Sequence, residues 1–348
     1  MSGKGNPKRS SSGSSRPKRS KTASAPRPSS GKKGKNSKGG GKGIFITALC
    51  LVIFAVMLLI GKPMTMTEIQ DMLGVGDSIA ADTAGGSSFD FAVHYLDVGQ
   101  GDSELIIAGG CSVLIDAGER EYGTAVLKAI KDLGVEKLDY IIATHPHSDH
   151  IGGMAEVIEN MDVGKMIVPK VPSELTPTSA AYERMLKAVK KKGLKLTQAK
   201  AGDTYTVGNA EMTILGPIGS NYEDLNDFSV VCKVKYKDTS FLFTGDASFP
   251  SEDDMTASDE DLSADVLKVG HHGSTTSSGR GILAAVQPSV CVISCGAGNS
   301  YGHPHEKALN RIRKYTDKIY RTDLDGAISI FSDGSKLYIR TANGSDNE

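Results

Sequence analysis

The sequence predicts an α/β fold with two β-sheets packed face to face and helices on their outer sides. From Phe89 onward, apolar runs of strand length alternate with patterns of helical period. The strand-like runs recur in two blocks, and helices follow each block, which is typical of two packed sheets covered by helices. We therefore expect one large domain over residues 89–340, followed by a flexible C-terminus at 341–348.

Residues 1–43 differ in composition from the rest of the chain. They hold thirteen of the 40 basic residues and none of the 41 acidic residues, and they are otherwise mainly Ser, Gly and Pro. Such a segment buries too little apolar surface to offset its chain entropy, so we expect a disordered basic tail. Its charge suits anionic lipid head groups or nucleic acid, whereas the remaining body is acidic.

Residues 44–61 are apolar, and no charged residue lies between Lys42 and Lys62. At about 1.5 Å per helical residue, this stretch is just long enough to cross a bilayer core. No small-x-small motif follows it closely, so we predict an uncleaved transmembrane signal anchor; a cleaved signal peptide and a secreted protein are the alternative. The basic excess predicts a single-pass protein of the cell membrane with a cytoplasmic N-terminus and an extracytoplasmic body. Residues 62–88 are expected to be a linker.

Within the body, apolar or alternating runs predict strands, and apolar residues three to four apart predict helices. Strands are expected at 90–97, 103–107, 111–115, 138–143 and 165–168, in short pieces through 194–215, as a hairpin at 228–236 and 239–244, and at 264–269, 289–294, 317–320, 326–331 and 336–340. Helices are expected at 121–133, 152–160, 178–192, 278–286 and 304–315. The cysteines show no metal-type pairing and are interpreted as small buried residues.

The stretch 144–153 carries the densest group of metal-ligand residues. His145, His147, Asp149 and His150 fall within six residues, between the apolar run 138–143 and a helical pattern. They should therefore lie on a loop at the carboxyl end of a strand, where open α/β sheets keep their ligand sites. Imidazole and carboxylate ligands together suit Zn, Mn or Fe.

Two further apolar strands stop at ligand-type residues. One ends at Asp246, whose carboxylate could give one oxygen to each of two metal ions. The other ends at His271 and His272. Adjacent residues on an extended chain point in opposite directions, so only one of these imidazoles should bind a given ion. The sequence does not decide between them, and His271 is the one we favour.

The His-x-His-x-Asp-His string, with Thr144 before it and Gly152-Gly153 after it, resembles the signature of the metallo-β-lactamase superfamily. Five other strings resemble the soluble hydrolase domain of the competence protein ComEC, and the resemblance covers about residues 90–332. These strings lie at 94–103, 244–246, 268–274, 299–305 and 320–323. The resemblance implies an αββα four-layer sandwich with two divalent metal ions, Zn or Mn, at one edge.

The resemblance also implies how the ligands are shared. The first ion would have His145, His147 and Asp246; the second would have Asp149, His150, Asp246 and one of His271 and His272. Asp116, at the end of an apolar strand, would orient the histidines. No histidine lies between His150 and His271, where many superfamily members carry one; Asn226 and Asp227 occupy that place, which leaves single-metal occupancy open.

Other polar residues near these strings have two interpretations each. Asp97, Gln100 and Asp102 would brace the site or contact substrate, and Ser274 belongs to the same class. His303 and His305 would act on substrate or as proton donors, or else form a helix start with a hydrogen-bonded imidazole. Arg321 would bind a phosphate or pair internally with Asp323 or Asp325.

Metal-activated water attacking phosphorus or a carbonyl is the mechanism that these residues predict. The resemblance favours a phosphodiester in nucleic acid, with Asp149, Asp246, His303 and His305 as catalytic residues. Phosphate contacts need local cations, for which Lys268, Arg280 and Arg321 are available in the sequence. The alternatives are hydrolysis of another ester or amide, such as a phosphocholine ester or a lactam, and a non-catalytic metal-binding surface module.

Overall fold

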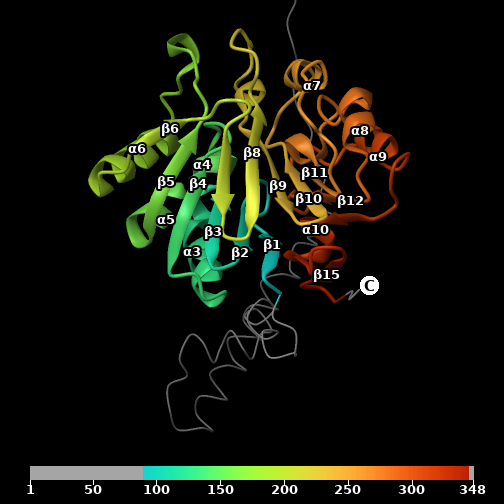
Figure 1. The fold of residues 1–348 in the computed structure, drawn as a ribbon. Coiled ribbons are helices and arrows are strands. Elements are labelled where there is room, and N and C mark those ends of the chain that lie inside the picture. The colour runs from blue at the N-terminus through green and yellow to red at the C-terminus, as the bar shows by residue number, and fades with distance from the viewer. Residues whose placement is uncertain (1–88, 345–348) are drawn as a thin grey trace, which may run out of the picture. The chain divides into compact units, whose positions relative to one another are not determined.

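A computed structural model describes residues 89–344 as an α/β domain with two mixed β-sheets (Figure 1). The predicted basic tail, membrane anchor and linker all lie outside the described residues. Among the described helices, none combines the length and the apolar character needed to cross a membrane.

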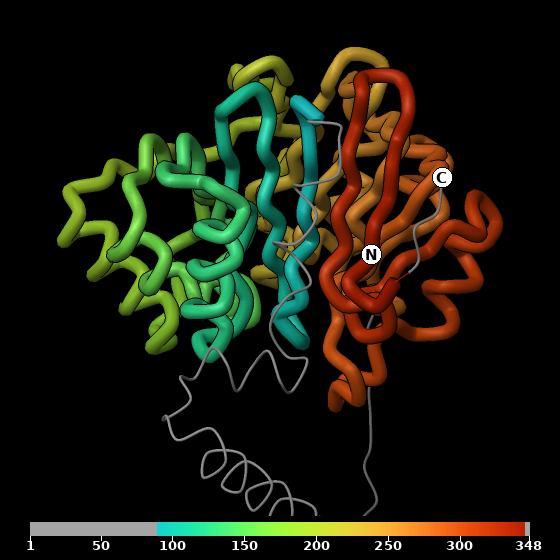
Figure 2. Tube along the Cα trace, turned by 90° about the horizontal axis from the view of Figure 1, so that it is seen from below, coloured from blue at the N-terminus to red at the C-terminus, as the bar shows by residue number. Residues whose placement is uncertain are grey.

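The first sheet has eight strands in the order β15-β14-β1-β2-β3-β4-β5-β6. Their bounds are β1 Phe91–Tyr95, β2 Glu104–Ala108, β3 Cys111–Ile115, β4 Lys137–Ile142, β5 Asp162–Val168, β6 Leu196–Gln198, β14 Ile328–Ser332 and β15 Leu337–Thr341. β14 pairs antiparallel with β1, so the C-terminal hairpin extends the sheet that begins the domain, and Figure 2 shows the two side by side. The first sheet therefore joins the first and the last strands of the domain, which lie far apart in the sequence.

The second sheet has seven strands in the order β13-β12-β11-β10-β9-β8-β7. Their bounds are β7 Thr204–Val207, β8 Ala210–Gly216, β9 Val231–Tyr236, β10 Thr239–Phe243, β11 Val266–Lys268, β12 Val290–Ile293 and β13 Ile319–Arg321. β10 to β13 run parallel to one another, so their carboxyl ends reach one edge of the sheet.

Helices connect the strands and cover the outer sheet faces. They are α3 Gly123–Asp132, α4 Ser148–Ile151, α5 Met154–Asn160, α6 Ala180–Lys192, α7 Phe249–Thr256, α8 Arg280–Val286, α9 Glu306–Ile312 and α10 Thr322–Asp325, with 3-10 turns at Arg120–Tyr122, Ser173–Leu175, Leu225–Phe228 and Gly270–Gly273. The sequence did not predict α4, α7 and α10, so Asp149 and His150, which were expected on a loop, lie on a short helix. α7 has the composition FPSEDDMT, in which acidic residues interrupt the apolar spacing that marks a helix.

Three apolar clusters hold these layers together. The largest takes side chains from both sheets, for example Val93 and Ile106 with Val234 and Phe241, and therefore fills the space between them. The second joins the first sheet to α3, α5 and α6, and the third joins the second sheet to α7, α8 and α9. Burial of apolar area at about 25 cal/mol per Å² is the main stabilising term of such an arrangement.

Candidate metal centre

The loop after β4 carries the first group of histidines. His145 and His150 are completely buried, and their ring centroids lie 4.1 Å apart. His147 precedes α4, and its Nδ1 lies 3.0 Å from Nε2 of His145. Because α4 starts directly after His147, the turn brings Asp149 and His150 back towards the same edge.

Asp246 is the point on which the imidazoles converge. It follows β10, and its Oδ2 lies 3.3 Å from Nε2 of His150 and 3.9 Å from Nε2 of His145. On the other side, the same oxygen lies 3.6 Å from Nε2 of His272 and 3.8 Å from Nε2 of His271. One carboxylate oxygen therefore faces four ring nitrogens from two loops.

The donor atoms of this cluster fit a divalent cation. The ligand atoms of Asp149, His150, Asp246 and His272 all lie within 4.8 Å of one another. Nε2 of His150, Nε2 of His272 and Oδ1 of Asp246 are buried and have no hydrogen-bond partner among the described residues. Buried polar atoms are normally paired, so a converging group of unpaired donor atoms indicates a site for a cation.

The turn at 270–273 places His272 in this cluster and His271 at its rim. The backbone is not extended there, since both histidines have positive φ, 50° for His271 and 53° for His272. Their side chains therefore do not point in opposite directions as expected, and both face Asp246. Nδ1 of His272 lies 2.9 Å from the Ser294 carbonyl, to which it can donate, leaving Nε2 for the cation. The geometry thus favours His272, although the sequence led us to favour His271.

Asp116, at the end of β3, fixes the metal loop from behind. Its Oδ2 lies 2.7 Å from Nδ1 of His150 and also accepts the Thr144 hydroxyl, and its Oδ1 accepts the Thr144 amide at 2.9 Å. With Nδ1 of His150 held in this way, Nε2 is directed at Asp246. Ser229 has a similar role for His145, because its hydroxyl lies 3.3 Å from Nδ1 of that ring and accepts the Asp246 amide.

Burial and the neighbouring charges shift the pKa values of the site residues in different directions. Burial lowers the pKa of His150, but Asp246 and Asp116 outweigh it, so the pKa lies well above its usual value. Burial dominates at His145, where the pKa falls well below its usual value. At Asp246, burial opposes ionisation, yet the His272 and His150 charges hold the pKa well below its usual value. An ionised carboxylate among imidazoles attracts positive charge, which a proton or a metal ion can supply.

Asp102 and Lys268 form a buried ion pair that links the two sheets behind the site. Nζ of Lys268 lies 2.7 Å from Oδ2 of Asp102, and both side chains are 1% exposed. Oδ1 of Asp102 lies 3.2 Å from Nδ1 of His272. Lys268 is therefore a structural partner of Asp102, and the expectation that it contacts phosphate is wrong.

The other residues of the N-terminal string and of the 226–227 turn lie around the site. Asp97 is exposed and accepts the Gly99 amide, and Gln100 accepts the Gly296 amide, so both brace loops. Oδ1 of Asp227 accepts hydrogen bonds from the amide and the hydroxyl of Ser248, so this oxygen is already paired. Asn226 is buried, and its side-chain carbonyl has no partner within the described range.

The histidines around Pro304 separate into two roles. The His303 ring lies 5.6 Å from the His271 ring, centroid to centroid, and its buried Nδ1 has no partner among the described residues. His305 instead precedes α9 and accepts the Thr275 amide through Nδ1, which matches the helix-start interpretation. Ser274 is also buried, and its hydroxyl lies 3.1 Å from the Thr276 hydroxyl.

Arg321 pairs internally, which is one of the two interpretations that the sequence left open. Its guanidinium donates to both carboxylate oxygens of Asp323, at 2.9 and 2.6 Å. This bidentate pair uses the Nε and Nη2 edge of the guanidinium, so that edge is not available to a phosphate.

Sequence reasoning missed Ser229 and Ser294 as partners of the histidines and missed the true role of Lys268. Ser294 follows β12, and its carbonyl reaches His272 across 22 residues of sequence. Lys268 and Asp102 are 166 residues apart. The sequence holds one weak signal for the role of Lys268: a lysine inside an otherwise apolar strand needs a buried countercharge.

Comparisons with known proteins agree with this geometry. Residues 96–296 match the family model of the metallo-beta-lactamase superfamily. The chain is 30% identical over 254 residues to ComE operon protein 3 of Bacillus subtilis. The aligned region covers 68% of this chain and 32% of that protein. The chain is 31% identical over 239 residues to Competence protein ComA of Neisseria gonorrhoeae, with 68% and 32% covered.

The chain thus spans about a third of the length of these curated relatives. Among solved structures, it is similar to the metallo-beta-lactamase fold protein YhfI from Bacillus subtilis, at 14% identity and a TM-score of 0.45, with 72% of this chain and 100% of that chain covered. The chain belongs to the metallo-β-lactamase superfamily, as a hydrolase related to the ComEC competence proteins with a His/Asp cluster that is able to bind metal.

Proposed function

We propose that this protein is a metal-dependent phosphodiesterase that cleaves nucleic acid strands outside the cytoplasm. The observation that carries the proposal is the group of unpaired, buried donor atoms around Asp246. His145, His147 and Asp246 would hold one Zn or Mn ion, and Asp149, His150, Asp246 and His272 would hold the other. Such ions supply Lewis acidity, which lowers the pKa of water from about 15.7 to about 7.

The residues of the chain itself have defined tasks in this proposal. Asp116 and Ser229 keep Nε2 of His150 and Nε2 of His145 directed at Asp246. The Ser294 carbonyl and Asp102 do the same for His272. The His303 ring lies 5.6 Å from the His271 ring, centroid to centroid, and we propose that it contacts the substrate beside this group.

A local basic surface supports a phosphate backbone as the substrate. Arg280 is exposed at the start of α8, and it lines a hollow of about 680 Å³ between α7, α8 and α9. Four basic residues (Arg280, Lys307, Arg311 and Lys314) and two acidic residues (Glu252 and Asp253) line this hollow. These cations compensate for the acidic body and take the place of Lys268 and Arg321, which are both paired. Phosphate contacts of this type would make binding fall steeply with salt.

The relatives named for competence support nucleic acid as the substrate class, since the similarity covers the part of the chain that holds the metal centre. We further propose that residues 44–61 anchor the protein in the cell membrane as a single span. The basic tail would then lie on anionic head groups of the cytoplasmic leaflet. Protease digestion of intact cells should remove the domain; a domain that stays protected would contradict this placement.

The activity is tested with the double variant His147→Ala/Asp149→Ala. We expect it to lose bound metal and turnover of single-stranded and plasmid DNA. The matched control is Lys128→Ala/Asp132→Ala, which removes an exposed ion pair on α3 and should keep both. Unchanged DNA cleavage in the first variant would refute the proposal.

The same purified protein should be assayed on a simple phosphodiester, a phosphocholine ester and a lactam. Turnover of the ester or the lactam without cleavage of DNA would assign another hydrolase activity. Melting that depends on metal, without turnover of any substrate, would indicate a non-catalytic metal-binding module.

A further inference from the structure

A pocket beside the metal loop is not explained by the metal centre. It has a volume of about 280 Å³, and its inner end is formed by Ala143, His145 and Pro146. Its walls come from β5, from the segment before α6, from α6 itself and from β6. The wall residues are mainly apolar: Val168, Val171, Tyr182, Met185, Leu186 and Leu196.

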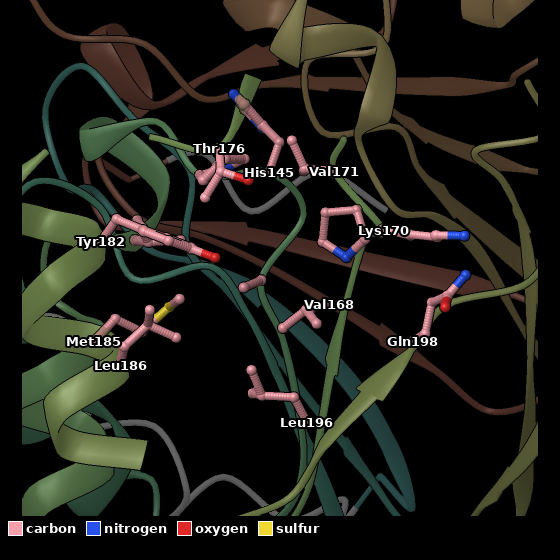
Figure 3. Close-up of a pocket in the computed structure, with 14 residues that line it drawn as sticks. His145, Val168, Lys170, Val171, Thr176, Tyr182, Met185, Leu186, Leu196 and Gln198 are labelled. Carbon is pink, nitrogen blue, oxygen red and sulfur yellow. The ribbon is translucent and has the colours of Figure 1, made fainter. Parts of the chain in front are cut away.

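Figure 3 shows these side chains around a common space, with the Tyr182 hydroxyl directed into it. Leu196 is 42% exposed, which is unusual for a large apolar side chain in a domain with well-formed cores. An apolar wall left accessible next to a reactive centre indicates that a ligand covers it.

Polar groups at the pocket are free to bind. The Tyr182 hydroxyl, the Gln198 carboxamide and the Lys170 ammonium are lining groups, and none makes a hydrogen bond or ion pair with another residue in the range 89–344. Figure 3 places Lys170 and Gln198 on the same side of the space. The occupant should therefore have apolar faces, hydrogen-bonding edges and a negative charge nearby.

The volume limits the size of the occupant. Ligand pockets range from about 300 to 1,000 Å³, so this one, at about 280 Å³, lies just below that range and suits a single ring system. The base of a nucleotide has flat apolar faces for Tyr182 and Leu186 and edge groups for Gln198, and the phosphate of the same nucleotide can pair with Lys170. An acyl chain would leave all three polar groups without partners, which disfavours it.

We propose that this pocket holds one unstacked nucleobase next to the phosphodiester at the metal loop. The inference rests on the proposed function and restricts its range of substrates. The substrate is a single strand or a strand end, because a base that is stacked in a duplex cannot enter the pocket. Any base can stack on an aromatic ring, so the pocket would distinguish single-stranded from double-stranded nucleic acid and would not distinguish one base sequence from another.

The chain contains no tryptophan, which makes a direct test possible. Tyr182→Trp would introduce the sole tryptophan, in the pocket wall, in the full chain held in lipid nanodiscs. Deoxyadenosine 5′-monophosphate should quench its fluorescence saturably, and deoxyribose 5-phosphate should not. Tyr315→Trp is the matched control, on a tyrosine 38% exposed and outside the pocket, and should show no saturable quenching.

Binding to the unaltered chain gives a second measurement that does not depend on the tryptophan. Saturation-transfer NMR should show stronger contact at the base protons of deoxyadenosine 5′-monophosphate than at its sugar protons. Leu186→Phe, which fills the pocket, should weaken this binding by about tenfold.

Three results would overturn the inference. They are equal responses to deoxyadenosine 5′-monophosphate and deoxyribose 5-phosphate, saturable binding of decanoate (a probe for an acyl chain) but not of the nucleotide, and no binding of the nucleotide. None of these readouts needs turnover. Cleavage of DNA without base binding would therefore refute the pocket alone, whereas base binding without any metal-dependent cleavage would refute the proposed function.

Discussion

The buried pair of Lys268 and Asp102 allows a quantitative prediction about stability. Both side chains are 1% exposed, and the pair joins β11 of the second sheet to the loop after β1 of the first. Lys268→Met keeps the apolar stem but leaves the buried Asp102 carboxylate with only the His272 ring, 3.2 Å away, as a partner. Removing one partner of a buried pair costs about 3–5 kcal/mol, because the remaining charge is uncompensated.

Lys233→Met is the matched control. Lys233 lies on β9 of the same sheet as Lys268, its side chain is 10% exposed, and its Nζ also lies 2.7 Å from a carboxylate, that of Asp261. Asp261, however, is 75% exposed and regains water when the lysine is removed. The loss should therefore be about 1 kcal/mol or less, as for pairs with one solvated partner.

The assay is urea unfolding of the full chain at neutral pH, followed by circular dichroism. Lys268→Met should lower the free energy of unfolding by several times the loss in Lys233→Met. Adding Asp102→Asn to Lys268→Met should recover a large part of the loss, because the second change removes the unpaired charge. Equal losses in the two methionine variants, or no recovery in the double variant, would refute the reasoning.

Two further predictions concern ligand choice and pH. His272→Ala should weaken Zn binding, measured by competition with a chelator, more than His271→Ala, because His272 belongs to the buried donor cluster; equal losses would contradict this. Burial raises the pKa of Glu252 from 4.5 to about 7, although the amides of Gly279 and Ser278 donate to its carboxylate. The folded state therefore binds this proton more tightly than the unfolded state does. Its free energy of unfolding should fall as the pH rises from about 4.5 to 7. The shift corresponds to a loss of about 3 kcal/mol in the free energy of unfolding. Glu252→Gln should abolish this loss when urea unfolding is measured across the same pH range. An unchanged pH dependence in the variant would show that Glu252 is not its source.

The sequence predicted those parts of the structure that are encoded locally. The loop at 144–153 is recognisable because its ligand residues are adjacent, and Asp116 and Asp246 because each ends an apolar strand. The structure brings Asp246 and the 271–272 imidazoles to that loop. The roles of these residues as ligands remain predictions.

The features that sequence reasoning missed depend on long-range packing or on backbone conformation. The partner of Lys268 lies 166 residues away, in the loop after β1 of the other sheet, so the sequence alone indicated that the lysine was an available cation. The choice between His271 and His272 depended on an assumed extended backbone, whereas the structure has positive φ at both residues. Arg321 had two possible carboxylate partners in the sequence, and it reaches both: its guanidinium donates to Asp323 and its backbone amide donates to Asp325.

The candidate centre is built from both sheets, and this has a consequence for how it responds to mutation. His145, Asp149 and His150 follow β4 of the first sheet, whereas Asp246 and His272 follow β10 and β11 of the second. A metal ion bound between them would link the sheets at the same edge as the Lys268–Asp102 pair. Since a ligand that binds only the folded state stabilises it by mass action, metal should offset part of the loss in Lys268→Met. Stability and metal affinity should therefore change together in this protein.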